Sequence, residues 1–233
     1  MTTCIVIPAR KGSKGLPGKN TRLFRGFPLV DWSLASGVWL QDRIPNAQVI
    51  ASSDDPEICA LVHEKYATQV TFRDRDPDLA SDVAGMAGVV LDAAQEADQY
   101  ILLQPTTPLR LQADLAGLLA GLSQTNSVAS CTEPFEAPED VIEYPTGVPI
   151  IQGDKTTYRQ ARDQQFGFVD GAFYAGSVSK LRDTNAFLHP DTLYYKQEIP
   201  MGADIDTAFD WAMTEALHDW LQDDGVSFVR PNR

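Results

Sequence analysis

The first segment with residues suited to chemistry lies between residues 9 and 20, directly after the apolar run Cys4 to Pro8. It combines three glycines at three-residue intervals with four basic side chains: Gly12, Gly15, Gly18, Arg10, Lys11, Lys14 and Lys19. A glycine-rich loop between a strand and a helix presents backbone N–H groups to phosphate, and nearby cations add charge. The segment therefore predicts a phosphate-binding loop, although an exposed basic loop with turn glycines would have a similar composition.

Two common phosphate-binding loops do not fit this spacing. A P-loop requires glycine where Ser13 stands and a hydroxyl residue where Asn20 stands. A dinucleotide-binding loop requires G-x-G-x-x-G, whereas these glycines are three residues apart. Both of these loop types are excluded.

A pair of carboxylates near the other end of the chain, Asp204 and Asp206, is suited to binding a metal. Side chains two residues apart in an extended segment point to the same side, so both can face one magnesium ion that keeps its other positions for phosphate and water. Thr207 and Asp210 have the spacing of a capping box, which accounts for them structurally and favours a negative charge at Asp206. Since the capping box does not explain Asp204, we assign metal binding to Asp204 and Asp206.

The elements that must position these residues follow an alternating pattern. Short β-branched runs are expected as strands at 4–8, 47–51, 69–72, 100–103 and 127–131, with further ordered segments at 171–175 and 194–199. Helices are expected at 29–40, from Ser53 as a capping hydroxyl to Tyr66, at 81–97 with Ser81 or Asp82 as cap, at 111–122 and at 207–221. This alternation predicts an α/β fold with a mainly parallel sheet.

One domain is expected to span residues 1–233, with an insertion at about 133–165 where Pro, Gly and acidic residues interrupt the pattern. The insertion is either a surface excursion or a dimer-forming arm. Gln104 follows the strand at 100–103, and ligands of open α/β sheets bind where parallel strands end. Gln104 is therefore expected to face the site, whereas Arg110 is equally well explained as a site residue or as a surface residue after the prolines.

The overall composition limits the partners. A net charge of -13 opposes binding to nucleic acid. Cys4, Cys59 and Cys131 show no CxxC pairing, which is typical of reduced thiols. No apolar run approaches the roughly 18 residues of a membrane span, and the N-terminus lacks the order of a signal peptide. We therefore expect a cytoplasmic protein with neither a nucleic-acid nor a membrane partner.

Several of these motifs together resemble one family. The segment I-P-A-R-x-G-S-K-G-x-P-x-K-N at 7–20 resembles the nucleotide-binding motif of the acylneuraminate (CMP-sialic acid) cytidylyltransferases. The runs LLQPTTPLR at 102–110, SSD at 52–54 and DIDTAFDW at 204–211 are similar to this family's L-L-Q-P-T-S-P-L-R, S-T-D and D-I-D-T-x-x-D-W/L. Looser matches are residues 72–82 to R-P-x-x-L-A-x-D, and residues 158–174 to R-R-Q-D followed by N-G-A-I-Y, with Asp170 in place of Asn.

The resemblance implies a three-layer Rossmann-like nucleotidyltransferase fold and an enzyme that transfers CMP from CTP to an acidic nonulosonate sugar with Mg²⁺. It implies catalytic roles for Arg10, Lys19, Asp204 and Asp206. It implies CTP contacts from the Ala9 backbone, Arg10, Lys14, Lys19, Asn20, Ser52 and Arg73, although Arg73 would equally well pair with Asp74 or Asp76. It implies sugar contacts from Gln104, Asp170 and either Arg159 or Arg162, and a homodimer formed through the insertion.

Two alternatives remain open. The sugar would be Kdo or a legionaminate- or pseudaminate-type sugar rather than an N-acylneuraminate, because the sugar-side motif is the looser one. A non-catalytic nucleotide-binding homologue is the alternative of another class. Retention of Arg10, Lys19, Asp204 and Asp206 argues against it, since a scaffold has no need for opposite charges at both ends of the chain.

Overall fold

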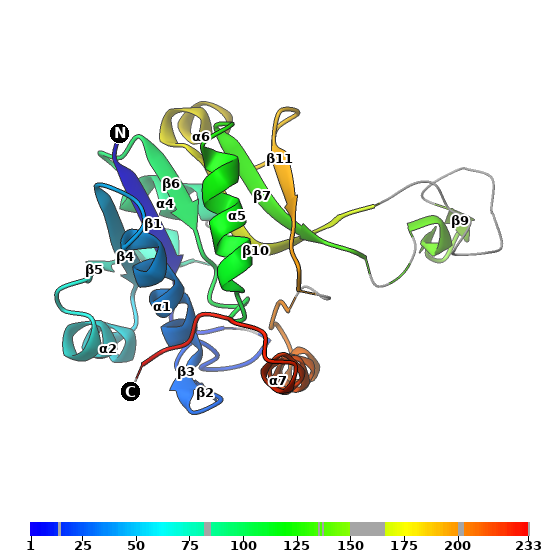
Figure 1. Cartoon of the computed structure of the whole chain (residues 1–233), viewed down its shortest axis with the longest axis horizontal. Coiled ribbons are helices and arrows are strands. Elements are labelled where there is room, and N and C mark those ends of the chain that lie inside the picture. Colours follow the sequence, from blue (N-terminus) through cyan, green and yellow to red (C-terminus); the bar gives the residue numbers. More distant parts are fainter. Residues whose placement is uncertain are drawn as a thin grey trace.

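The computed structural model describes residues 1–13, 15–81, 85–134, 136, 138–149, 166–199 and 203–232, and is built on a seven-stranded sheet (Figure 1). The sheet order is β11-β7-β10-β6-β1-β4-β5. The bounds are β1 Thr3–Pro8, β4 Ala47–Ser53, β5 Val70–Asp74, β6 Gln99–Leu102, β7 Ser127–Thr132, β10 Phe168–Ser177 and β11 Leu193–Lys196. Every neighbouring pair is parallel except those of β10, which runs antiparallel to β6 and β7. The predicted α/β fold with a mainly parallel sheet is confirmed.

Alternate side chains of the central strands enter two different cores. Ile5 and Ile7 of β1 belong to a core with α1 (Leu29–Gln41), α2 (Pro56–Lys65) and α5 (Gln112–Leu122). Cys4 and Val6 belong to a core on the other face, with α4 (Met86–Ala93) and α6 (Val178–Thr184). Because strand side chains alternate between faces, a continuous apolar run covers both, and the result is three layers.

A third apolar cluster lies beyond the sheet and joins the N-terminal segment to α7 (Ala208–Asp223). Phe24, in the short strand β2 (Leu23–Phe24) that pairs with β3 (Phe27–Pro28), is fully buried. Its ring packs edge-on against Trp32 of α1 at 5.4 Å and against Trp211 of α7 at 5.5 Å between centroids. This cluster fixes the glycine-rich loop against the helix that follows Asp206.

Two local predictions were wrong at helix starts. The α2 helix is capped by Asp55, whose carboxylate accepts from the Glu57 N–H at 3.0 Å, and not by Ser53. The helix expected from residue 81 is instead a short α3 (Pro77–Ala80) followed by α4, which begins after Gly85 and ends eight residues later. The carboxylate of Asp55 is better placed than Ser53 because Pro56 occupies the first helical position.

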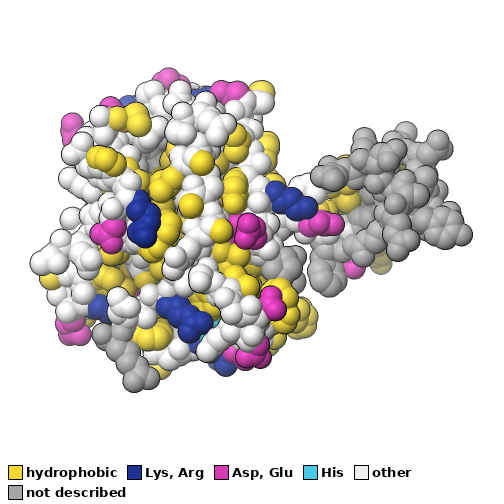
Figure 2. Space-filling view, viewed as in Figure 1, with side chains coloured by type: hydrophobic (Ala, Val, Ile, Leu, Met, Phe, Trp, Pro, Cys, Tyr) yellow, Lys and Arg dark blue, Asp and Glu magenta, His cyan; other side chains and the backbone are white. Residues whose placement is uncertain are grey.

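The segment between β7 and β10 leaves the sheet and projects from one side of the molecule (Figure 1). Its described part holds a 3-10 turn η1 (Pro138–Asp140) and a hairpin of β8 (Ile142–Glu143) with β9 (Val148–Pro149). Tyr144, in the turn of this hairpin, is 90% exposed. Among the described residues, no helix is long and apolar enough to cross a membrane. Figure 2 shows Lys and Arg scattered over the visible face rather than gathered in one patch.

Candidate functional site

The candidate site lies beyond the carboxyl ends of the neighbouring strands β1, β4 and β6. Strand β1 pairs with β4 on one side and with β6 on the other, so the chain first builds outward from β1 and then crosses to its other side. This is a topological switch point, where open α/β sheets bind ligands beyond the carboxyl ends of their strands. The segments that follow β1 and β6 carry most of the predicted site residues.

Backbone contacts fix the first part of the glycine-rich loop. The Ala9 N–H donates to Ser52 O at 2.9 Å, and the Ala9 carbonyl accepts the Ser53 hydroxyl at 2.5 Å. The buried Asn20 amide donates to Arg10 O at 3.0 Å, which ties the end of the loop to its start. Arg10, half-buried, donates to Ala80 O at 3.3 Å. Lys14 lies outside the described residues.

Lys19 joins this loop to the segment before α7. Its buried ammonium donates to Ile205 O at 2.5 Å and to Asp206 Oδ1 at 2.9 Å, across 187 positions of sequence. Gly15 makes the same junction from the loop backbone, because a Cβ at this position would lie 2.4 Å from Asp206 O. Both features bring the basic loop against the carboxylate pair.

Asp204 and Asp206 flank the buried Ile205, and both are exposed. The pKa of the Asp204 carboxyl is raised, chiefly because neighbouring protein atoms remove part of its hydration, and also because of the charge of Asp206. A hydrogen bond from Thr106 and the charge of Lys19 act in the opposite direction. The predicted capping box of Thr207 and Asp210 is present at the start of α7.

The donor set at this point suits a hard divalent cation. Two neighbouring carboxylates with one ammonium form an electrostatic arrangement that a cation would relieve. Within the described ranges, no cluster of three or more His, Cys, Asp or Glu side chains offers a complete metal cage. Mg²⁺ commonly takes one or two carboxylates and completes its shell with water and substrate phosphate, so Asp204 and Asp206 fit it.

Two arginines, Arg73 and Arg75, lie near the end of β5. The structure brings Arg75 against Ser52 at the end of β4, beside the candidate site. Arg73 instead forms a bidentate pair with Asp92 of α4, at 2.6 and 2.8 Å, and not with Asp74 or Asp76. Arg75 is 4% exposed and donates to Ser52 through Nε to the hydroxyl at 3.1 Å and through Nη2 to the carbonyl at 2.6 Å. Burial lowers the pKa of Arg75, and the charge of Arg10 acts in the same direction. Arg75 was missed by the sequence reasoning.

On the sugar side of the predicted site, Gln104 lies at the end of β6 and is half-buried. Its amide donates to Gly171 O at 3.4 Å, and Gly171, with φ +76°, leaves 3.1 Å between its missing Cβ and that amide nitrogen. Arg110 is neither at the surface nor open to the site. It is fully buried, with its guanidinium against the carbonyl groups of Gln104 and Ala172.

Asp170 is buried, and both of its carboxylate oxygens accept hydrogen bonds. Oδ1 accepts from Ser130 Oγ at 2.5 Å and from the Ala172 N–H at 3.0 Å, and Oδ2 accepts from Gln197 Nε2 at 2.6 Å. The side chain is therefore engaged by protein on both oxygens. Arg159 and Arg162, the alternative sugar-binding residues, lie outside the described residues.

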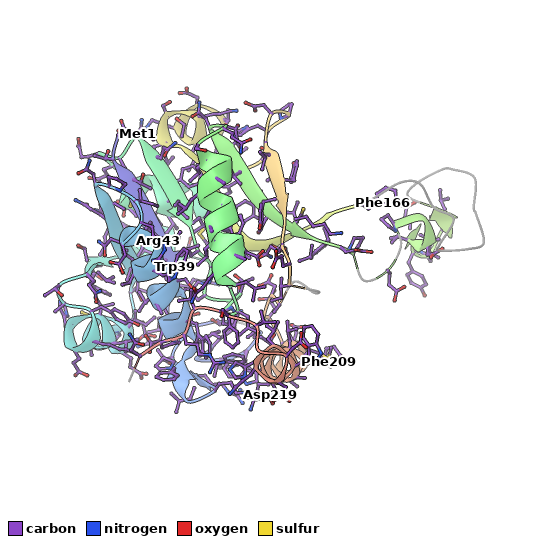
Figure 3. All side chains as sticks on the ribbon, viewed as in Figure 1. Met1, Trp39, Arg43, Phe166, Phe209 and Asp219 are labelled. Carbon is purple, nitrogen blue, oxygen red and sulfur yellow. The ribbon has the colours of Figure 1, made fainter. Side chains whose placement is uncertain are left out.

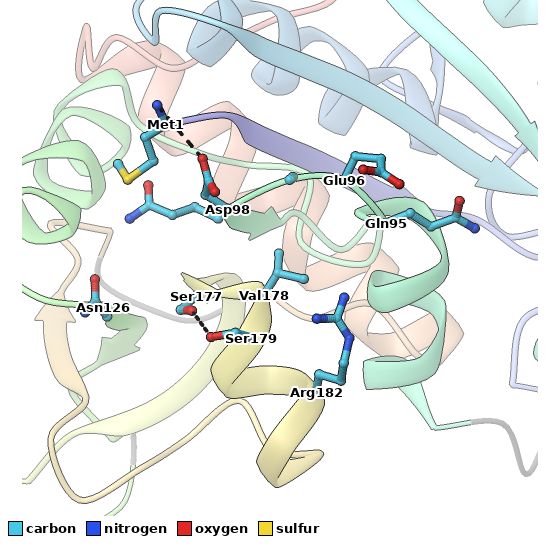
Figure 4. A pocket seen from close by; sticks show the side chains of 11 residues that line it. Met1, Gln95, Glu96, Asp98, Asn126, Ser177, Val178, Ser179 and Arg182 are labelled. Carbon is cyan, nitrogen blue, oxygen red and sulfur yellow. Dashed lines mark hydrogen bonds and ion pairs between the residues drawn. The ribbon is translucent and has the colours of Figure 1, made fainter.

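A cleft of about 670 Å³ lies at the opposite ends of the strands, where β1 and β6 begin (Figure 4). None of the predicted site residues lines it. It is lined by polar groups that include Asp98, Asn126, Ser177 and Arg182. Asp98 there receives the amino terminus of Met1 at 3.9 Å. This cleft is separate from the strand ends at which the candidate site is built.

The comparisons with known proteins agree with this geometry. Residues 4–167 match the cytidylyltransferase family. CMP-N,N'-diacetyllegionaminic acid synthase of Legionella pneumophila is 27% identical, over 96% of this chain and 99% of the relative. Pseudaminic acid cytidylyltransferase of Campylobacter jejuni is 30% identical, over 94% and 97%. N-acylneuraminate cytidylyltransferase of Streptococcus agalactiae is 25% identical, over 91% of this chain and 52% of the relative.

Solved structures share the fold at lower identity. CMP:2-keto-3-deoxy-manno-octonic acid synthetase, solved with CTP, superposes with a TM-score of 0.61 at 19% identity, over 94% of this chain and 99% of the other. The 4-diphosphocytidyl-2C-methyl-D-erythritol synthase of Anaerococcus prevotii superposes with a TM-score of 0.62 at 12% identity, over 95% and 98%. These likenesses show that the chain shares their fold.

Proposed function

The chain belongs to the cytidylyltransferase family, within the group that makes CMP-activated nonulosonate sugars, and from this premise we propose that it transfers CMP from CTP to the anomeric hydroxyl of an acidic nonulosonate, releasing pyrophosphate. The observation that carries the proposal is the junction of Lys19 with Asp206. It places a cation of the glycine-rich loop beside a pair of carboxylates at the strand ends.

Phosphate binding is supported by the loop and by its cations. The Lys19 ammonium has three N–H donors. Among the described residues, Ile205 O and Asp206 Oδ1 accept two of them, and the third would donate to a phosphate oxygen of CTP. Arg10 and Arg75 add positive charge next to the end of β4. We infer that Arg10, Lys14, Lys19, Asn20 and the Ala9 backbone hold CTP, with Arg75 replacing Arg73 beside Ser52.

The reaction requires positioning and charge neutralisation more than covalent catalysis. The anomeric oxygen attacks the α-phosphorus in line, the bond to the bridging oxygen breaks so that pyrophosphate leaves, and the hydroxyl proton passes to water. Lys19 and Arg10 would stabilise the charge that develops on the phosphate oxygens. Magnesium held by Asp204 and Asp206 would supply further neutralisation of these oxygens.

The sugar is proposed to be a nonulosonate, with N-acylneuraminate-type and diamino sugars as the candidates. Relatives that align over nearly their whole length with this chain are named for legionaminic and pseudaminic acid, which favours a diamino nonulosonate. Gln104, held by Gly171, is the described side chain that we place on the sugar.

Pyrophosphate release tests the function. Purified protein with CTP and Mg²⁺ is offered N-acetylneuraminate, diacetyllegionaminate, pseudaminate and Kdo in parallel. We expect release with at least one nonulosonate and a weaker response to Kdo. Release with none of the sugars would refute the enzyme, and a preference for ATP or UTP over CTP would refute cytidylyl transfer.

Arg75 and Arg73 form a matched pair for testing the nucleotide site. Arg75→Met is expected to raise KM for CTP by about 10–100-fold, because a charged hydrogen bond contributes roughly 1.5–3 kcal/mol. Arg73→Met is expected to leave CTP kinetics within about twofold and to lower the free energy of unfolding by about 1 kcal/mol or less, since its partly exposed pair with Asp92 is weak. Steady-state kinetics and urea unfolding measure both. Equal changes in KM for CTP in Arg75→Met and Arg73→Met would contradict the assignment of Arg75 rather than Arg73 to the nucleotide site.

We also infer a homodimer formed through the projecting segment. A two-stranded hairpin is marginally stable by itself, and β8-β9 exposes Ile142, Tyr144 and Val148. A partner surface would cover these apolar side chains. The mass of the protein in dilute solution tests the proposal, and a monomer at assay concentrations would contradict it.

A further inference from the structure

Arg110 is a buried charge that the proposed reaction does not use. It is 0% exposed, and its guanidinium donates to groups of three different elements. The acceptors are Ala172 O of β10 at 2.8 Å, Ser33 Oγ of α1 at 2.9 Å, and, in the loop after β6, Gln104 O at 2.8 Å and Thr107 Oγ1 at 2.9 Å. None of these acceptors is a carboxylate.

A buried guanidinium without a carboxylate in contact is costly unless the surrounding structure compensates for it. Burial lowers the pKa of Arg110 to about 9, so the side chain is still charged at neutral pH, and the nearby charge of Asp170 opposes the shift. Both residues also bind the same backbone unit, since Arg110 donates to Ala172 O and Asp170 accepts from Ala172 N–H. Arg110 therefore holds Ala172 of β10 from outside the strand, and Asp170 holds the same residue from within it.

The loop that Arg110 fixes carries contacts to both halves of the site. Gln104 O accepts from Arg110 and from Ser33 Oγ at 3.2 Å, while the Gln104 amide donates to Gly171 O. Two residues later, Thr106 O accepts the Ile205 N–H at 2.8 Å, and the Thr106 side chain bonds the Asp204 carboxyl. A shift of this loop would move Gln104 and the Asp204 segment together.

We propose that Arg110 is a positioning residue that clamps residues 104–107 between α1 and β10, with Asp170 as its countercharge, and so aligns Gln104 with the Asp204–Asp206 segment. Asp170 then acts through Arg110 and Ala172 rather than by contacting the sugar. The kinetic part of this inference rests on the proposed function. The structural part concerns the free protein and does not depend on it.

The kinetic test compares Arg110→Met with the control Arg43→Met. Arg43 lies over the ring of Trp39 of α1, with 3.6 Å between the guanidinium carbon and the ring centroid (Figure 3). Arg110→Met is expected to lower kcat/KM for the sugar acid by about 10²-fold, the size of effect that a misplacement of about 1 Å produces. KM for CTP should stay within about threefold, because the four acceptors of the Arg110 guanidinium lie outside the nucleotide loop. Arg110→Lys should not restore activity, since its ammonium lacks the planar fork. An unchanged kcat/KM for the sugar acid in folded Arg110→Met would overturn the proposal.

A second pair covers the case in which Arg110→Met does not fold. Thr107→Val removes one acceptor of the guanidinium without changing the side-chain shape, and Thr107→Ser keeps the hydroxyl. Hydrogen exchange of the Ile205 and Thr107 amides in the free protein should be faster by about tenfold in Thr107→Val, corresponding to a local loss of about 1.4 kcal/mol, and near wild type in Thr107→Ser. Equal exchange in both variants would refute the clamp. Absence of wild-type turnover with every sugar would refute the proposed function alone.

Discussion

Lys19→Met is expected to lower kcat/KM for CTP by about 10²–10³-fold, the effect of removing one preorganised donor from a developing negative charge. The ammonium joins the loop to the Asp204–Asp206 segment through an ion pair with Asp206 at 2.9 Å. Methionine has a similar length and is apolar, so it fills the same space. The loss should be larger in kcat than in KM if Lys19 binds the phosphate oxygens most strongly in the transition state.

The fold should survive this substitution. Asp206 is 74% exposed in its side chain, so water solvates the carboxylate when its partner is removed. The main loss is the hydrogen bond to Ile205 O, which costs about 1–3 kcal/mol when a buried acceptor stays unpaired. Lys180→Met is the matched control, because Lys180 pairs with Asp191 on the surface of α6 at 2.6 Å. An equal loss of activity in the control, or full activity in Lys19→Met, would contradict the role of Lys19.

Local signals in the sequence were sufficient for the parts of the site that depend on neighbouring residues. The glycine-rich loop follows β1 as predicted, and the capping box of Thr207 and Asp210 forms at the start of α7. Gln104 lies at the end of β6 because an apolar run ends there at a proline. Such features are determined by backbone geometry within a few residues, which a linear pattern records.

The hydrogen-bond partners of Arg73 and Arg110 depend on tertiary packing and were not predicted. Arg73 pairs with Asp92, 19 residues away on α4, because this helix packs over β1 and β4, and β4 is the sheet neighbour of β5. Arg110 was assigned to the site or to the surface, and it is instead fully buried in a hydrogen-bond network. One signal was available for Arg75: in the family pattern R-P-x-x-L-A the arginine stands four residues before the leucine, and Leu79 is four residues after Arg75.

Asp204→Asn and Asp206→Asn are expected to lower kcat by about 10³-fold at 1 mM Mg²⁺, because loss of roughly 4 kcal/mol of transition-state neutralisation corresponds to that factor. The two variants should differ in stability. Asp206→Asn leaves the buried Lys19 ammonium without its carboxylate, so its melting temperature should fall by several degrees. The Asp204 carboxylate accepts a hydrogen bond from Thr106 that an amide oxygen can also accept, so Asp204→Asn should be nearly neutral for the fold.

Magnesium titration separates metal binding from a general loss of charge at this edge of the sheet. In Asp204→Asn the Mg²⁺ concentration for half-maximal activity should rise by about 10-fold or more, so that part of the activity returns at high Mg²⁺. Asp219→Asn on α7 is the matched control, because Asp219 pairs with the exposed Arg25 and with the neighbouring His218. It should titrate like wild type. If the midpoints of Asp204→Asn and Asp219→Asn coincide, Asp204 is not a ligand, and the carboxylate pair acts on the loop through Lys19 alone.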